Sequence, residues 1–415
     1  MGVSKVDFAG NTLVDLTGDS VTPATLKKGE TAHNAAGEQI VGTMEAGGTT
    51  HGAPGDITFY DYDGTIVTSW TLSELATKTA LPDYPSHDGL ICQGWNWSLA
   101  DLKTTNRKMN VGAMYITDDG KTRIYIRLEE GRTSPMLGVC PNGTVTVDWG
   151  DGTTPDTLTG TSTTTVKWTP NHAYAAPGEY VIKLTVYGTM GFYGNSSFST
   201  GSAILQYSSS SDNRNHSYRN SVQKIEIGNG VTSAGGNAFY SCYSLASITI
   251  PNSVTNIGPN AFSYCYSLSS ITIPNGATSI GFSTFSYCYS LASITIPNGV
   301  TSIGTSAFYS CYTLASITIP NSVTNIGTTA FYICYSLVSI TIPNSVTNIG
   351  PNAFYNCYCV AFYDFTAYTT VPALINTNVF TGIPTDCQIR VPASLVDAWK
   401  AATNWSTYAD HIVGV

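Results

Sequence analysis

The chain has 415 residues, and its 18 Lys and Arg against 27 Asp and Glu give a formal net charge of −9. This length allows about two to four domains, and the acidic balance argues against a basic face that binds nucleic-acid phosphates. No run of about 18 apolar residues is present, so no membrane span is predicted. Residues 1–16 lack the basic start and apolar run of a secretory signal.

The N-terminal region, residues 1–46, is polar, rich in Gly and Thr, and too short for a large core. It ends with the pattern TAHxxxGxxIxGxM, which begins at Thr31 and finishes at Met44. This ending resembles a segment common at the N-termini of phage and prophage tail proteins, and the resemblance implies attachment to a virion. Residues 47–56 are rich in Gly and Thr, and we predict that they form a flexible linker.

Residues 57–119 are predicted to form a small module. Within it, the stretch Pro85–Leu99 resembles uncharacterised modules of the same phage tail proteins. Trp95 and Trp97 lie in this stretch. We expect both to be buried in a core, and stacking on a sugar is the alternative.

The same module contains the pattern DxDGT at Asp61–Thr65. This pattern resembles the nucleophile motif of haloacid-dehalogenase-type phosphatases, in which the first Asp attacks phosphate beside a magnesium ion. Asp118 and Asp119 fit the later acidic pair of that family. Only about 60 residues separate the two elements, which is too few for several βα units. Because Asp-Gly is also a common hairpin turn, we interpret the motif as a turn, with a phosphatase as the distant alternative.

Residues 120–190 contain two stretches of alternating apolar residues. Val145–Thr153 reads VTVDWGDGT, and His172–Val186 reads HAYAAPGEYVIKLTV. The alternation predicts strands with one buried face. Both stretches resemble the polycystic-kidney-disease (PKD) domain, an immunoglobulin-like β-sandwich, and the resemblance implies a spacer or a contact with protein or sugar. Asp148 and Asp151 could hold calcium, but turn geometry is the favoured interpretation.

A loop rich in Ser and Asn is predicted over 191–221, and a strict repeat follows it. Cysteines recur every 23 residues, and Phe and Pro residues keep the same interval. A period of this length predicts a solenoid whose units bury their apolar faces against their neighbours. No Asp, Glu, Lys or Arg occurs from Ile227 to Tyr363. The periodic cysteines are Cys242, Cys265, Cys288, Cys311, Cys334 and Cys357.

Two interpretations of this cysteine column stay open. Cysteines aligned in a buried column act as small hydrophobic residues, which is the favoured interpretation. Stacked strands lie about 4.8 Å apart, a separation that also suits a disulfide between neighbouring units.

Each unit of the repeat predicts one strand and one turn. Ile248 and Ile250 flank Thr249, the alternation of a short strand. Pro251 then ends the strand because it has no N–H to donate. The turn is predicted from apolar residues at every third position, which a tight helical turn would place on one inward face: Phe239, Cys242 and Leu245.

These residues resemble the BspA-type leucine-rich repeat, whose signature is close to AFxxCxxLxxIxIPxxVxxIG, over five consecutive units. The resemblance implies a leucine-rich-repeat solenoid over 222–392. The tail, residues 393–415, is predicted to cap the last apolar face of the solenoid.

Outward residues of the units form the candidate recognition surface. Tyr among Ser, Gly and Asn is the composition of adaptable binding surfaces, because rings give contact area at low entropy cost. The alternative is that these are tolerated surface residues of recently duplicated units. On the turn face the tyrosines are Tyr240, Tyr243, Tyr264, Tyr266, Tyr287, Tyr289, Tyr309, Tyr312, Tyr332, Tyr335, Tyr355 and Tyr358. On the strand face the threonines are Thr249, Thr272, Thr295, Thr318 and Thr341.

The sequence therefore predicts a mainly β, multidomain chain, in which an immunoglobulin-like sandwich precedes a solenoid of 23-residue units. It favours a non-enzymatic phage tail fibre or receptor-binding protein of the virion, with a bacterial cell-surface adhesin as the alternative. The expected partners are a host cell-surface glycan or protein and other tail or baseplate proteins, and the resemblance to phage fibres implies a homotrimer. No nucleic acid, membrane insertion, cofactor or metal is expected.

Overall fold

The structure is a computed structural model, and it describes residues 56–105, 109–194, 204–206, 218, 220–374 and 376–415 together with four early strands. Residues 1–55 form one compact unit, and residues 56–415 form another. In the first unit, β1 (Lys5–Phe8) pairs antiparallel with β2 (Asn11–Asp15), and β3 (Thr31–His33) pairs with β4 (Gln39–Val41). The rest of the predicted attachment segment, nearly all of the linker and most of the 191–221 loop lie outside the described residues.

The module at the start of the second unit is a mixed four-stranded sheet with two short helices. Its strand order is β6-β5-β8-β7, and β5 runs parallel to β8. The sheet has its own hydrophobic core, in which the rings of Phe59, Trp70 and Trp95 pack edge to face. The elements are β5 (Ile57–Tyr60), β6 (Ile66–Trp70), α1 (Leu72–Thr77), β7 (Leu90–Trp95), α2 (Leu99–Thr105) and β8 (Met109–Thr117).

The next region is an antiparallel sheet in the order β11-β10-β13-β9. Alternation along β10 and β13 buries Val145, Val147, Ile182 and Leu184 completely, as the sequence pattern predicts. The first part of β10 pairs separately with β12 and β14. The strands are β9 (Thr122–Leu128), β10 (Met136–Asp148), β11 (Asp156–Thr161), β12 (Lys167–Trp168), β13 (Gly178–Phe192) and β14 (Leu205–Gln206).

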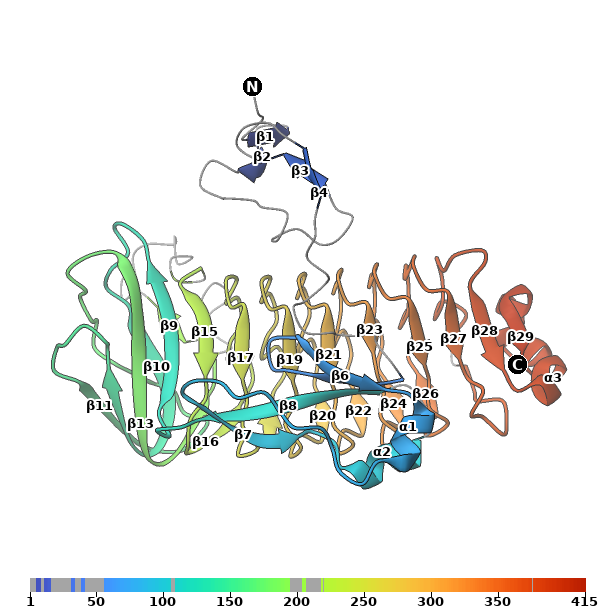
Figure 1. Cartoon of the computed structure of the whole chain (residues 1–415), viewed down its shortest axis with the longest axis horizontal. Coiled ribbons are helices and arrows are strands. Elements are labelled where there is room, and N and C mark those ends of the chain that lie inside the picture. Colours follow the sequence, from blue (N-terminus) through green and yellow to red (C-terminus); the bar gives the residue numbers. More distant parts are fainter. Residues whose placement is uncertain are drawn as a thin grey trace. The chain divides into compact units, whose positions relative to one another are not determined.

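The repeats form a β-solenoid, so the mainly β fold with stacked 23-residue units is confirmed. Each coil contributes a strand to a first parallel row and, in most coils, a short strand to a second row (Figure 1). The first row is β15 (Val222–Glu226), β17 (Ser247–Thr249), β19 (Ser270–Thr272), β21 (Ser293–Thr295), β23 (Ser316–Ile317), β25 (Ser339–Thr341), β27 (Phe362–Asp364) and β28 (Gln388–Val391). The second row is β16 (Val231–Ala234), β18 (Asn256–Ile257), β20 (Ser279–Ile280), β22 (Ser302–Ile303), β24 (Asn325–Ile326) and β26 (Asn348–Ile349).

The turn between the two rows is not the predicted helix. Cys242 N donates to Phe239 O at 3.2 Å, as in a helical turn, but Phe239 N donates to Ala261 O of the next coil at 2.7 Å. Ser241 has a φ of +59°, which no right-handed helix allows. Bonds within the turn therefore alternate with bonds between coils, because the next coil competes for every second N–H. The inward positions of Phe, Cys and Leu are nevertheless as predicted, and all are buried.

Both ends of the solenoid are covered. At the first coil, β15 pairs antiparallel with β9 and β16 pairs parallel with β13, so the sheet of the preceding region continues into the solenoid. At the last coil, β29 pairs with β28, and Trp399 and Trp405 are fully buried. The capping elements are η2 (Ala393–Leu395), α3 (Val396–Ala401), η3 (Trp405–His411) and β29 (Ile412–Gly414). Among the described residues, no helix is long and apolar enough to cross a membrane.

Candidate recognition surface

The tyrosines of the turn face form two ladders of stacked rings. In the outer ladder, neighbouring rings lie 4.5 to 5.4 Å apart between centroids, with interplanar angles of 5° to 16°. The inner ladder is stacked from Tyr264 to Tyr287 and from Tyr309 to Tyr355, and it is tilted or edge-on elsewhere. The outer ladder comprises Tyr243, Tyr266, Tyr289, Tyr312, Tyr335 and Tyr358, and the inner ladder comprises Tyr240, Tyr264, Tyr287, Tyr309, Tyr332 and Tyr355.

Stacking determines which part of each tyrosine ring a ligand can contact. A ring in the middle of the outer ladder has a neighbouring ring over each face, so its edge is the part that remains open. The outer ladder is half-buried through Tyr312, and exposure rises to 37% at Tyr335 and 53% at Tyr358. Burial together with the neighbouring Tyr243 and Tyr289 raises the pKa of Tyr266 to about 12. The Tyr266 hydroxyl is therefore a neutral hydrogen-bonding group at physiological pH.

Behind the ladders, cysteine and phenylalanine columns fix the spacing. The Phe rings stack at 5.2 to 5.5 Å from Phe239 to Phe354. Each periodic cysteine from Cys265 to Cys357 directs its Sγ at the Phe carbonyl of the preceding coil, at 3.2 to 3.3 Å. All six periodic cysteines are buried and none forms a disulfide, so they pack as small hydrophobic residues.

The threonine column has a different environment. Thr249, Thr272 and Thr295 are buried, while Thr318 and Thr341 are half-buried. Strand β8 of the module lies across β17, β19 and β21 (Figure 1). A Cβ on Gly112 of β8 would lie 2.4 Å from Thr295 Oγ1 and 2.5 Å from Thr272 Oγ1. Thr272 and Thr295 therefore face the module and do not form an outward surface, whereas Thr249 Oγ1 accepts a hydrogen bond from Ile227 N at 3.3 Å.

Hydrogen bonds reinforce this contact between the module and the solenoid. Trp97 Nε1 donates to Ile296 O at 3.0 Å, and Asn110 N donates to Thr318 Oγ1 at 3.1 Å. Ser270 Oγ donates to Tyr62 O at 3.0 Å. Trp97 is thus buried, as expected, but against the solenoid as well as within its own module.

The DxDGT motif forms the hairpin turn between β5 and β6. Asp61 N donates to Thr65 O at 2.8 Å, the Asp63 carboxylate accepts from Thr65 N, and Gly64 has a φ of +90°. Asp61 is buried and its Oδ2 lies 2.7 Å from Nε2 of His87. The turn interpretation therefore holds, and the carboxylate of the first Asp in the motif contacts the His87 ring.

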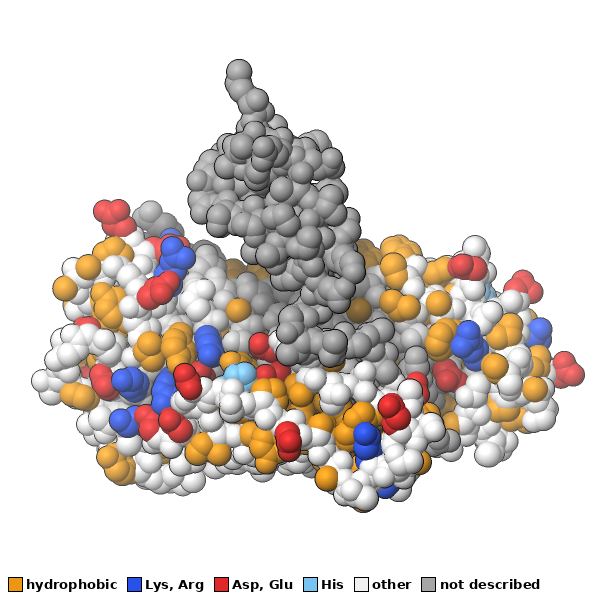
Figure 2. Space-filling model, viewed as in Figure 1, with side chains coloured by type: hydrophobic (Ala, Val, Ile, Leu, Met, Phe, Trp, Pro, Cys, Tyr) orange, Lys and Arg blue, Asp and Glu red, His pale blue; other side chains and the backbone are white. Residues whose placement is uncertain are grey.

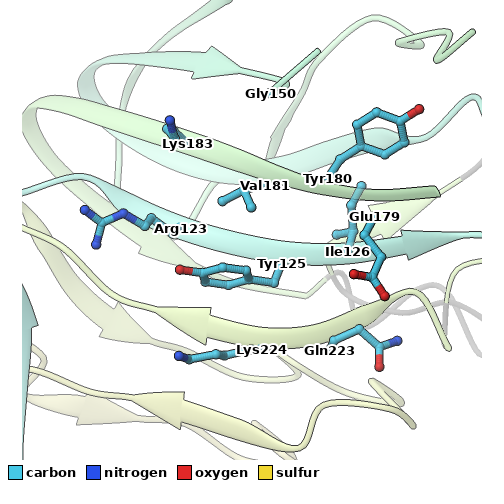
Figure 3. Close-up of a pocket in the computed structure, with 10 residues that line it drawn as sticks. All are labelled: Arg123, Tyr125, Ile126, Gly150, Glu179, Tyr180, Val181, Lys183, Gln223 and Lys224. Atoms are coloured by element: carbon cyan, nitrogen blue, oxygen red, sulfur yellow. The ribbon is translucent and has the colours of Figure 1, made fainter. Parts of the chain in front are cut away.

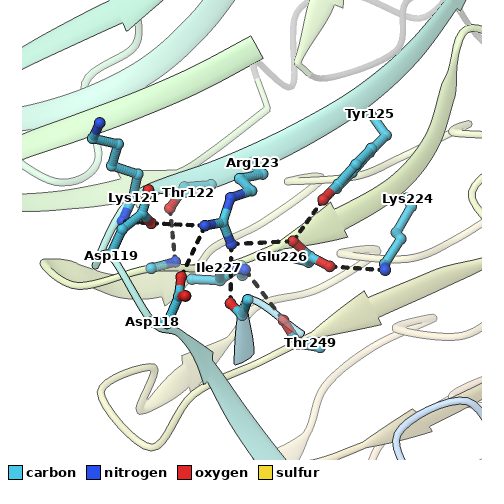
Figure 4. Close-up of polar contacts among 12 residues, drawn as sticks. Asp118, Asp119, Lys121, Thr122, Arg123, Tyr125, Lys224, Glu226, Ile227 and Thr249 are labelled. Atoms are coloured by element: carbon cyan, nitrogen blue, oxygen red, sulfur yellow. Dashed lines mark hydrogen bonds and ion pairs between the residues drawn. The ribbon is translucent and has the colours of Figure 1, made fainter. Parts of the chain in front are cut away.

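Asp118 and Asp119, which fit the later acidic pair of the phosphatase motif, bind Arg123 instead. Each has a carboxylate oxygen 3.0 Å from Arg123 Nη2. Arg123 also faces the buried Glu226, which accepts from Tyr125 OH at 2.8 Å and pairs with Lys224 at 2.8 Å (Figure 4). The network joins the start of the sheet at β9 to the first solenoid strand.

A groove that the sequence reasoning missed lies beside this network. It has a volume of about 750 Å³ and opens between β9, β13 and β15 (Figure 3). Its lining includes Tyr125, Tyr180, Lys183 and Lys224. The alternating pattern of the strands could have predicted that these side chains point outward. It could not have predicted the pairing of β9 with β15, which brings them together.

Asp148 and Asp151 of the sheet region occupy turn geometry. Asp148 Oδ1 accepts from Gly150 N, and Asp151 Oδ1 accepts from Thr153 N. Asp151 Oδ2 lies 2.8 Å from Nε2 of His172, whose ring stacks on Trp149 at 4.5 Å. The described residues contain no group of three or more His, Cys, Asp and Glu side chains placed to hold a metal ion.

The fold and the ladders define a β-solenoid of stacked repeats with capped ends. A family model described as "BspA type Leucine rich repeat region" matches six copies over residues 192–315 and 255–384. This part of the chain therefore consists of BspA-type leucine-rich repeats. No curated protein matches the chain.

Solved structures of leucine-rich-repeat proteins are also similar. A T. pallidum protein (TpLRR) is 36% identical with a TM-score of 0.32, covering 34% of this chain and 65% of that one. A Bacteroides ovatus protein is 32% identical with a TM-score of 0.34, covering 40% and 44%. A leucine rich cell surface protein from Faecalibacterium prausnitzii is 25% identical with a TM-score of 0.30, covering 48% and 65%. Each match spans less than two thirds of the other protein.

Proposed function

We propose that this chain is a non-enzymatic recognition protein of the adhesin type, carried on a bacterial cell surface, and that its solenoid binds a polysaccharide or a protein. The observation that carries the proposal is the pair of tyrosine ladders on a solenoid without charged side chains from Ile227 to Tyr363. Charged side chains lie instead over the sheet region, over the module and over the C-terminal end (Figure 2). The outer ladder offers a long row of ring edges and hydroxyls, with ring centroids 4.5 to 5.4 Å apart.

The BspA-type repeats support this proposal because stacked repeats give long surfaces suited to binding rather than a single catalytic cleft. The module covers the strand face at β17, β19 and β21, and we infer that the turn face is the recognition surface. Binding through rings and neutral hydroxyls depends little on ionic strength, because no ion pairs are screened. We therefore expect affinity to stay nearly constant between low and high salt.

A phage tail fibre or receptor-binding protein is the second candidate. The TAHxxxGxxIxGxM ending at Thr31–Met44 favours it, because the pattern resembles tail proteins. Both candidates use the ladders in the same way and differ in what carries the chain, a cell or a virion. Tail and lysis genes beside the coding sequence, or the chain in purified virions, would favour the phage. A bacterial surface operon would favour the adhesin.

The proposal is tested by sedimentation of the full chain with bacterial cell envelopes. Replacement of Tyr289 and Tyr312 by Ser in one variant removes two central rings of the outer ladder, and we expect most of the binding to be lost. Tyr187→Ser is the matched control, because Tyr187 is 64% exposed on β13 and lies outside the ladders. Equal binding by both variants and the unmodified chain would contradict the proposal.

A further inference from the structure

We propose that the ligand of the tyrosine ladders is a neutral, extended glycan that lies along the solenoid axis and is held by ring edges and hydroxyls. This inference rests on the proposed function and specifies its ligand. It depends on four features of the ladders: occupied ring faces, constant spacing, absence of charge and neutral hydroxyls.

The occupied ring faces exclude the commonest way in which tyrosine binds a sugar. Tyr289 lies 4.8 Å from Tyr266 and 4.7 Å from Tyr312, with interplanar angles of 5° and 9°. No sugar ring fits between rings at this separation. A ligand along the middle of the outer ladder therefore meets ring edges and hydroxyls, while an open ring face remains only at the ends.

The spacing distinguishes between extended polymers. An extended polypeptide presents side chains to one side at about 6.6 Å intervals, two residues at about 3.3 Å each. The outer ladder repeats at 4.5 to 5.4 Å, so such a peptide would lose register within a few coils. In a chain of pyranose rings joined through opposite corners, the length of one sugar unit is close to the separation of neighbouring coils. Such a chain can therefore repeat the same contact along the ladder.

The absence of charged side chains on the ladders restricts the class of glycan that they can bind. Recognition of sulfated, phosphorylated or uronic acid polymers depends on Lys and Arg. Neither residue occurs from Ile227 to Tyr363, so the ladders offer an anionic polymer no ion pair. The hydroxyl of Tyr266 stays protonated because burial and the adjacent rings raise its pKa. Neighbouring hydroxyls hydrogen-bond one another, Tyr243 with Tyr266 and Tyr289 with Tyr312. Because a phenolic hydroxyl can both donate and accept, each keeps a further hydrogen-bonding position that matches the hydroxyls of a neutral sugar.

The test uses an array of neutral β-linked glucans, mannans and chitin oligomers beside anionic glycans, probed with the full chain. We expect binding to the neutral, extended glycans. The key variant replaces both Tyr289 and Tyr312 by Phe, which keeps the stacked rings and removes two hydroxyls. We expect this variant to bind at least about fivefold more weakly, because each hydrogen bond that is lost contributes to affinity. Tyr187→Phe is the matched control and should bind like the unmodified chain.

Two results would overturn the inference and leave the proposed function standing. In the first, the chain binds envelopes but no neutral glycan on the array, and protease treatment of the envelopes abolishes binding, which would indicate a protein ligand. In the second, the double Phe variant binds as tightly as the unmodified chain, which would show that the hydroxyls are not used. If the chain binds neither envelopes nor glycans, the proposed function itself fails.

Discussion

Two positions in each coil hold the backbone in the left-handed region without glycine. One of them directly precedes each cysteine, with φ between +56° and +63°. Two of the tyrosines of the candidate recognition surface, Tyr264 and Tyr287, lie at this position. The structure adds a backbone requirement, which Asn satisfies well and β-branched residues satisfy poorly. The residues at this position are Ser241, Tyr264, Tyr287, Ser310, Ile333 and Asn356.

Ile333 is the one β-branched residue at this position and should be strained. Its φ is +60°, where an L-residue with a branched Cβ is disfavoured. Ile333→Asn should raise the free energy of unfolding by about 0.5–1 kcal/mol, because relief of strain exceeds the loss of a half-buried side chain. Denaturant unfolding measures the change. The reverse substitution, Asn356→Ile at the equivalent position, should destabilise; stabilisation by it would refute the strain argument.

The outer tyrosine ladder makes stability depend on alkaline pH. The pKa of Tyr266 is raised to about 12 by burial and by Tyr243 and Tyr289, whereas an unfolded tyrosine titrates near its ordinary value of about 10. A raised pKa in the folded state means that its stabilising contribution is complete below about pH 10 and is lost as the pH rises toward about 12.

A difference titration of tyrosinate absorbance between the unmodified chain and Tyr266→Phe should isolate this group. The difference between the two titration curves reports the ionisation of Tyr266, and its midpoint should lie well above pH 10 and close to pH 12. Titration of the missing group at or below its ordinary pKa would show that Tyr266 is not enclosed by its neighbours.

At the scale of elements, the module and the solenoid meet through backbone and hydroxyl groups. Their hydrophobic cores are separate: Trp70 and Trp95 lie in one cluster, and the solenoid columns belong to the other. The contact therefore depends on fit and hydrogen bonding. Gly112 allows the fit, because Thr272 and Thr295 occupy the space of its missing side chain.

Gly112→Ala should force the module away from the strand face. The new Cβ would overlap the two threonine hydroxyls, and overpacking of this kind costs about 1–3 kcal/mol. We expect a separate, lower-temperature unfolding transition for the module in calorimetry. The same substitution in a Thr272→Ala, Thr295→Ala background should restore a single transition, because the colliding hydroxyls are gone. If the two unfolding transitions persist in this background, the close contact between Gly112 and the threonines is not the cause of the destabilisation.

The sequence predicts the repeat unit well but not what covers it. The strict positions of Phe, Cys, Leu and Ile fix the inward columns, because a solenoid needs the same apolar residue in every coil. The burial of Thr272 depends on contact with Gly112, about 160 residues earlier in the chain, and no periodicity signals such a pair. The 23-residue period predicts that the tyrosines of successive coils stack. Only the structure shows which ring faces are covered by neighbouring rings and which are open.

At the scale of the whole molecule, the second unit is a solenoid whose two ends are covered by other elements. Each coil contacts its neighbours, so stability is close to a sum over coils and end contacts. The first coil is extended by β9 and β13, while the last coil depends on the short C-terminal elements.

Trp399→Ala should open the C-terminal end of the solenoid. The ring is fully buried, lies 4.5 Å from Trp405 and 5.2 Å from Phe365, and its removal should cost about 3–5 kcal/mol. Hydrogen exchange should show faster opening at β28 and β29 than at β17. Lys400→Ala, an exposed position on the same helix, is the control and should leave exchange unchanged. Uniform acceleration along all coils would contradict local capping.

The claim that the turn face carries recognition is tested most directly by footprinting the full chain free and bound to cell envelopes with hydroxyl radicals. On binding, we expect the exposed ladder residues Tyr335 and Tyr358 to lose reactivity, while the exposed Tyr187 on β13 keeps it. Protection confined to the groove beside Tyr125 or to the module, with Tyr335 and Tyr358 unchanged, would contradict the account.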